Sequence, residues 1–219
     1  MMLRRLALAL LLAGTTLLGG CGGIRYLAYL FAPTGRSRTV PAAFKDLQDS
    51  RVAVVVFTDM DTEFEYPYAR PRLTERVTAE LSEHIKGIET VEPRQILNYQ
   101  RDHVYWDAED RTTLGKRFGA DYVVFIAVRE YSLREPGSTT LYRGRITGEV
   151  SVHKTSLPAG AARVWPAERG PQTVTVSYPK DAAMGTPDAQ LPRIRNETES
   201  LFVDKLAKHF YKHKEQTEP

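Results

Sequence analysis

Cysteine is almost absent from this chain, since the 219 residues include only Cys21. One thiol excludes an internal disulfide and any metal site built from several cysteines. An excess of one charge is lacking too: 30 lysines and arginines face 27 aspartates and glutamates, and Arg4 and Arg5 supply two of the three net positive charges. The basic residues are scattered along the chain, so the composition gives no indication of nucleic-acid binding.

The chain also lacks the short motifs of several enzyme classes. No GxSxG, GxGxxG, HExxH or phosphate-binding glycine loop occurs. Five histidines are present, and His209 and His213 lie four apart, but lysines surround them as at a solvated helix end. We therefore predict no catalytic residue, no metal site and no cofactor.

One acidic stretch does suggest chemistry. Val52 to Phe57 is a continuous apolar run, and aspartates or glutamates follow at positions 59, 61, 63 and 65. The stretch resembles the first motif of haloacid-dehalogenase-type phosphatases, Asp-x-Asp-x-Thr, but Thr62 stands one position early. A calcium loop would need a turn glycine and a closing glutamate. We predict an ordinary loop, and an envelope hydrolase or metal-dependent enzyme using Asp59–Glu65 is the alternative.

The first 20 residues have the three parts of a secretory signal. Arg4 and Arg5 precede the apolar stretch Leu6 to Leu18, which is too short to span a bilayer comfortably, and small residues follow. Leu18-Gly19-Gly20-Cys21 resembles the bacterial lipobox, and it ends at the single cysteine. We predict a cleaved signal peptide over residues 1–20 and a lipidated Cys21. Because no aspartate follows Cys21, we expect an outer-membrane lipoprotein that faces the periplasm.

Beyond Cys21 we predict a tether, one domain and a tail. The lipidated cysteine and tether cover residues 21–46, which are rich in turn residues near their end. A single domain is expected over residues 47–214 and a disordered tail over 215–219.

The domain has the patterns of an α+β fold whose first half is α/β-like. Apolar runs at 52–57 and 121–131 predict central strands, and a stripe of apolar residues every fourth position from Leu73 to Ile85 predicts a helix. Alternation between Tyr142 and His153 predicts a half-exposed strand. We expect a mixed sheet of about five strands with helices packed on it.

Three local signals add detail. Asp107 is a plausible N-cap for a helix carrying Leu114 and Phe118. Residues 179–195 contain turn signals and are expected to be irregular. Asn196-Glu-Thr-Glu199 resembles a capping box and is expected to open the last helix.

Several segments in order resemble the superfamily of the TolB amino-terminal domain. They are RVAVVVF, GIETVEPRQIL, LGKRFGADYVVFIAV and GRITGEVSVHKT, and the likeness covers about residues 50–178 and the last helix. Lipoprotein members include the curli secretion component and the outer-membrane activators of penicillin-binding proteins. The resemblance implies a non-catalytic assembly, scaffolding or regulatory module that acts on an envelope protein partner.

Candidate partner contacts come from two places. One is the outward face of the alternating strand, with Arg143, Arg145 and Glu149. The other is the set of loop aromatics Tyr66, Tyr68 and Trp106, because aromatic side chains often anchor interfaces.

Overall fold

The computed structural model describes residues 36–167 and 170–217, which divide into two units. β1 (Arg36–Val40) pairs with β8 (His213–Thr217) in a two-stranded sheet, and all of these residues except His213 belong to the smaller unit. Residues 36–40 of the predicted tether and residues 215–217 of the predicted tail thus form strands, and His213 and Lys214 at the end of the predicted domain belong to the second of them. Each strand satisfies its backbone groups on the other, which a pattern within either segment does not reveal. The larger unit spans Pro41–His213.

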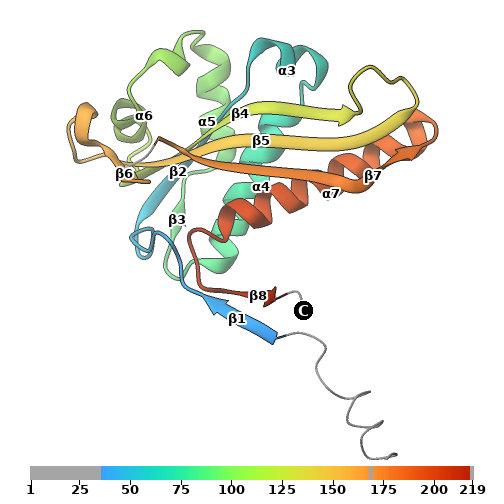
Figure 1. Ribbon diagram of the computed structural model, residues 1–219. Coiled ribbons are helices and arrows are strands. Elements are labelled where there is room, and N and C mark those ends of the chain that lie inside the picture. Colours follow the sequence, from blue (N-terminus) through green and yellow to red (C-terminus); the bar gives the residue numbers. More distant parts are fainter. Residues whose placement is uncertain (1–35, 168–169, 218–219) are drawn as a thin grey trace, which may run out of the picture. The chain divides into compact units, whose positions relative to one another are not determined.

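A six-stranded mixed sheet forms the centre of the larger unit (Figure 1). Its order is β3-β2-β4-β5-β6, and β7 also pairs with β5. β2 runs parallel to β3 and β4, whereas β5 runs antiparallel to its neighbours. The strands are β2 (Arg51–Phe57), β3 (Glu89–Thr90), β4 (Tyr122–Arg134), β5 (Leu141–Lys154), β6 (Arg163–Trp165) and β7 (Gln172–Met184). The α+β class is confirmed, with six strands in this sheet where about five were expected.

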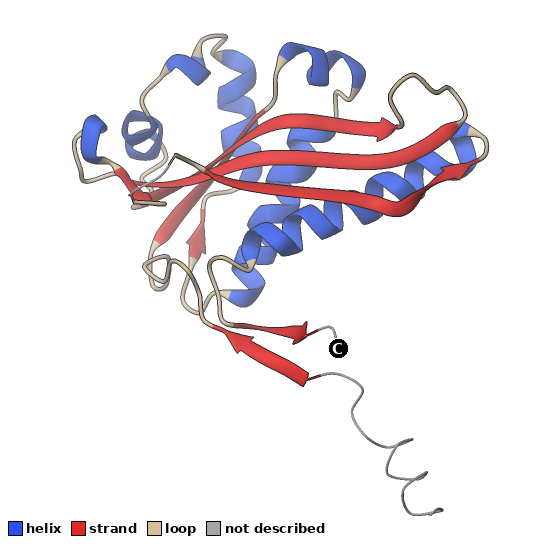
Figure 2. Ribbon diagram, viewed as in Figure 1, coloured by secondary structure: helices blue, strands red, loops and turns tan. Residues whose placement is uncertain are grey.

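Helices cover both faces of the first half of the sheet (Figure 2). Val52, Val54 and Val56 pack with α4 and α7, and Ala53 and Val55 pack with α5 and α6, so the run predicted to be buried on both faces is confirmed. The helices are α3 (Met60–Glu65), α4 (Ala69–His84), α5 (Pro93–Asp102), α6 (Arg111–Arg117) and α7 (Pro187–Ala207), with short 3-10 turns η1 (Trp106–Ala108) and η2 (Ala159–Ala161).

Two glycines let α7 lie directly against β5. A Cβ atom at Gly144 would be 1.9 Å from Thr198 Oγ1, and one at Gly148 would be 2.7 Å from Phe202 Cζ. Any larger residue would therefore push the helix off the strand. The inward face of β5 thus alternates large apolar side chains with glycines, as the predicted period of two requires.

Two aspartates start helices. Asp59 Oδ1 accepts a hydrogen bond from Thr62 N at 2.8 Å, and residues 60–65 form α3 where a loop was expected. Asp110, whose Oδ1 accepts from the amide of Thr112, caps α6. The prediction that Asp107 caps this helix is wrong, because Asp107 lies in η1.

The last helix starts earlier than predicted. Residues 179–195 are not irregular, since β7 continues to Met184 and α7 begins at Pro187. A proline in the first helical turn loses no hydrogen bond, so this turn signal is compatible with a helix. Asn196 therefore lies inside α7, and the prediction that Asn196–Glu199 caps the start of the last helix is wrong. Its Oδ1 accepts a hydrogen bond from Arg72 Nη2 at 2.7 Å.

His153 on β5 is expected to make stability depend on pH. Burial, followed by the nearby Arg111 charge, lowers its pKa from 6.5 to about 4. Between those two pKa values the unfolded chain binds more protons than the folded one. The contribution of His153 to the free energy of unfolding is therefore fully present above pH 6.5 and is lost as the pH falls toward 4. Urea unfolding at pH 7 and pH 4.5 should show a smaller decline for His153→Gln than for the wild type. Equal declines would contradict this account.

Candidate binding surface

Most of the exposed large apolar side chains of the described residues lie in two segments, one that follows β2 and one that follows α5. Phe64 is 92% exposed and Tyr68 is 73% exposed, although both belong to large apolar or aromatic types that usually contribute to a core. The group comprises Met60 and Phe64 of α3, Tyr68 before α4, and Val104 and Tyr105 after α5. We call these five residues the apolar edge. Elsewhere in residues 36–167 and 170–217, only Met184 and Leu201 are comparable exposed apolar residues.

A hollow of about 540 Å³ joins the two segments of the apolar edge. Met60 lines it on one side and Val104 on the other, and Phe57 at the end of β2 forms part of its wall. Gln100 is 4% exposed and also lines this hollow. Its Nε2 donates to Val56 O at 3.0 Å, while its Oε1 has no hydrogen-bond partner within the described chain. In α/β sheets the carboxyl ends of strands are common ligand sites.

The acidic residues after β2 are partly engaged within the protein. The Thr62 hydroxyl and amide lower the pKa of Asp59, which caps α3. Glu63 accepts from Thr58 Oγ1 at 2.9 Å and pairs with Arg70. In the described part of the chain, the acids of residues 59–65 do not form a group of three or more that could hold a metal ion. The contacts of Asp59 and Glu63 give these two acids roles in starting and holding α3.

The three predicted loop aromatics lie in different environments. Tyr66 packs against Tyr131 in a tilted arrangement with a centroid distance of 4.9 Å, and its hydroxyl accepts a hydrogen bond from the Leu133 amide at 3.3 Å. Trp106 is 4% exposed and packs with Phe57 in the core on the face of the sheet that α5 and α6 cover. Tyr68 alone is on the surface.

Tyr105 takes the exposed position that sequence reasoning gave to Trp106. It is 82% exposed, next to the buried tryptophan. Adjacent aromatic residues in a loop point to different sides, and the sequence has no periodic pattern there to decide which one is buried. Met60, Phe64 and Val104 were also missed, because apolar residues beside a strand end are usually assigned to the core.

The predicted contacts on β5 lie on its outward face and are engaged in ion pairs. Arg143 Nη1 lies 3.2 Å and Arg145 Nη2 lies 2.6 Å from the carboxylate of Glu135, and these arginine side chains are 27% and 28% exposed. Glu149 pairs with Arg129 at 2.8 Å. A partner at this face would meet charged groups that already have partners within the protein.

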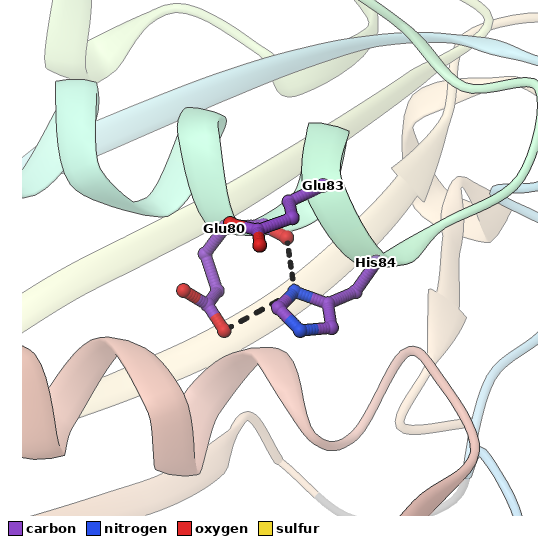
Figure 3. A group of neighbouring side chains, drawn as sticks. All are labelled: Glu80, Glu83 and His84. Carbon is purple, nitrogen blue, oxygen red and sulfur yellow. Dashed lines mark hydrogen bonds and ion pairs between the residues drawn. The ribbon is translucent and has the colours of Figure 1, made fainter.

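One group in the described chain has the composition of a metal site: Glu80, Glu83 and His84 at the end of α4 (Figure 3). His84 Nδ1 lies 3.0 Å from the Glu80 carbonyl oxygen and 3.3 Å from Glu80 Oε1. The ring also stacks on Tyr211 at 4.5 Å, and the Tyr211 hydroxyl donates to Glu80 Oε1 at 3.4 Å. These contacts of Glu80 and His84 link the end of α4 to the segment after α7.

No protein-family model and no curated protein matches the sequence. Solved structures with a similar fold include the PelC dodecamer from Paraburkholderia phytofirmans, at 12% identity and TM-score 0.40, over 81% of this chain and 99% of that one. Lipoprotein GNA1162 from Neisseria meningitidis shares 12% identity at TM-score 0.37, over 71% and 99% of the two chains. The hypothetical protein CT253 from Chlamydia trachomatis shares 12% identity at TM-score 0.44, over 73% and 96%. These identities and TM-scores indicate only a loose similarity of fold and carry no information about function.

Within the ranges that the structure describes, no helix is both long and apolar enough to cross a membrane. Cys21 and the signal segment lie outside these ranges.

Proposed function

We propose that this protein is a lipid-anchored module of the bacterial outer membrane, facing the periplasm, which binds an envelope protein partner through the apolar edge. Five of the seven exposed large apolar side chains of the described residues belong to two segments that meet at the hollow lined by Met60 and Val104, and this observation carries the proposal. The lipobox-like sequence before Cys21 supports the anchoring. A TolB-like role in assembly or regulation, without catalysis, is consistent with this surface.

The apolar edge has the makeup of a binding surface. Exposed apolar patches in soluble domains commonly mark interaction sites, and each large apolar side chain contributes about 1.5–3 kcal/mol when it is fully buried. Phe64, Tyr68 and Tyr105 offer aromatic anchors of the kind that dominate interface energetics. The hollow between Met60 and Val104 provides a place for a side chain of the partner.

Charge around the apolar edge indicates what the partner carries. Asp61, Glu65 and Asp107 are exposed in the same segments, and the exposed Arg101 of the hollow is paired with Asp102. Since opposite charges steer association and like charges suppress it, we expect basic residues around the apolar anchor of the partner.

The double variant Phe64→Ala, Tyr105→Ala is expected to lose the partner. The tagged full-length protein is cross-linked in cells, and its co-purified envelope proteins are quantified by mass spectrometry. At least one protein captured by the wild type should fall by about tenfold or more, because interface anchors commonly cost more than 1 kcal/mol when truncated. Thermal unfolding should be nearly unchanged, since both side chains are exposed.

The matched control removes apolar residues from elsewhere. Met184→Ala, Leu201→Ala also truncates two exposed apolar side chains, both outside the apolar edge. It should retain every captured protein. If both double variants retain the same proteins as the wild type, the apolar edge is not the binding surface.

A further inference from the structure

A second hollow lies on the side of Tyr68 that faces α7. Its volume is about 240 Å³, and residues of the turn before α4, of β4 and of α7 line it. We call it the arginine pocket; its lining residues are Glu65, Tyr66, Pro67, Tyr68, Ala69, Arg72, Tyr131 and Arg195. Aromatic and apolar groups form most of the wall, and two guanidinium groups are the basic part.

A buried carboxylate fixes two of the lining residues. Glu199 of α7 is completely buried and accepts from Arg72 Nε and Nη2 at 3.0 and 2.8 Å. It also accepts from the Tyr131 hydroxyl at 2.8 Å. Charge-assisted contacts of this kind hold side chains in one orientation. Arg72 and Tyr131 are therefore preorganised at the pocket before any ligand arrives.

Positive charge exceeds negative charge around this carboxylate. Arg76 Nε lies 3.4 Å from Glu199, so Arg72 and Arg76 share one acid. Arg195, one helical turn before Glu199, makes no hydrogen bond or ion pair with the residues that the structure describes, although it is half-buried. Glu65 is the remaining acid of the lining, and it is exposed.

An uncompensated guanidinium in a partly dry site favours an anion. A charge that is removed from water loses solvation, and an opposite charge with matching donors offsets the loss. The guanidinium of Arg195 can form a planar two-bond contact with a carboxylate, while the apolar walls suit a hydrophobic group behind it. The small volume and the single unpaired guanidinium suit one carboxylate better than a doubly charged phosphate.

We propose that the arginine pocket binds a carboxylate on an apolar or aromatic stem, with the carboxylate on Arg195 and the stem against Tyr66 and Tyr68. Two sources share this chemistry, the terminal residue of a protein chain and a small aromatic acid. The site is distinct from the apolar edge except for Tyr68, and binding of the carboxylate there does not require that a partner occupy the apolar edge.

The test uses two probes that differ only in charge. Full-length protein in lipid nanodiscs is titrated with N-acetylphenylalanine and with its amide, and the Arg195 side-chain Nε–H signal is followed by NMR. The acid should shift the signal saturably. The affinity of the amide should be lower by at least about tenfold, because the charge-assisted contact is lost. Equal binding of acid and amide, or no binding of the acid, would overturn the proposal.

Two variants test whether the probe binds in the arginine pocket. Ring signals of Tyr66 and Tyr68 report binding in both variants. Arg195→Gln should weaken the acid about tenfold or more, whereas Arg193→Gln should not, since Arg193 on the same helix is exposed and contacts Gln190. Retention of affinity in Arg195→Gln would refute the assignment. Tighter binding of acetyl-Gly-Gly-Phe than of N-acetylphenylalanine would identify a chain terminus as the natural source, and equal affinity would identify a small acid.

Discussion

Glu199→Gln is expected to lower the free energy of unfolding by about 3–5 kcal/mol. The substitution keeps the size of the side chain but removes the negative charge that Arg72 and Arg76 share. Glu199 itself is completely buried, so water cannot reach the position of its carboxylate to compensate for the lost charge. The amide would also direct an N–H group at guanidinium and hydroxyl donors, leaving donors unpaired.

The lower end of that range is the more realistic value. The Arg72 and Arg76 side chains are 31% and 34% exposed, so part of their charge stays hydrated after the substitution. Even 3 kcal/mol is a large share of the roughly 5–15 kcal/mol that stabilises an ordinary domain. Urea unfolding followed by circular dichroism at pH 7 gives the value directly.

Glu197→Gln is the matched control. Glu197 lies on the same helix but is exposed, and its replacement should change stability by no more than about 0.5 kcal/mol. If Glu199→Gln costs less than about 1 kcal/mol, the buried ion-pair network contributes little, and the fixed orientation of Arg72 at the arginine pocket is not supported.

The sequence predicts best those elements whose signal lies within a few residues. β2 and the first part of β4 are continuous apolar runs, and such runs have few alternatives to a strand covered on both faces. The stripe on α4 likewise gives one buried helix face. Local periodicity is sufficient there because each residue's neighbours on its face are set by the element itself.

Contacts between distant segments are not predictable in this way. Arg72 and Glu199 are 127 positions apart, and nothing near either residue indicates that they meet. The pairing of β1 with β8 is a similar case. The start of α7 was missed for another reason. Pro187 and Pro192 are turn signals by composition, yet the first occupies a helical turn that tolerates proline and the second lies inside the helix.

The candidate site was predicted only in part. Of the loop aromatics, Tyr68 is exposed, whereas Tyr66 and Trp106 complete the two cores. Exposure of Met60 and Phe64 depends on how α3 is held by the Asp59 cap and by the Glu63–Arg70 pair. That orientation is a property of three-dimensional packing, and an apolar residue at either position is compatible with burial on sequence grounds.

Cys21→Ser is expected to abolish membrane anchoring. The prediction rests on three features of the sequence: the charged and apolar signal before Cys21, the small residues at the cleavage site, and the single cysteine of the chain. At about 0.8 kcal/mol for each buried methylene group, two or three acyl chains hold a protein on a bilayer, and serine lacks the thiol that carries the first of them. The wild type should incorporate a palmitate analogue and fractionate with the outer membrane.

The serine variant should remain unprocessed by signal peptidase II and should incorporate no label. Thr16→Ser is the control, because it makes a comparably small change within the signal and leaves the thiol intact. The anchor and the domain are separable in this test: urea unfolding of residues 41–213 should be the same in all three proteins, since Cys21 lies outside this unit. If the wild type labels no better than Cys21→Ser, the chain is not a lipoprotein, and its placement at the outer membrane is lost with it, whereas the apolar edge and the arginine pocket are unaffected.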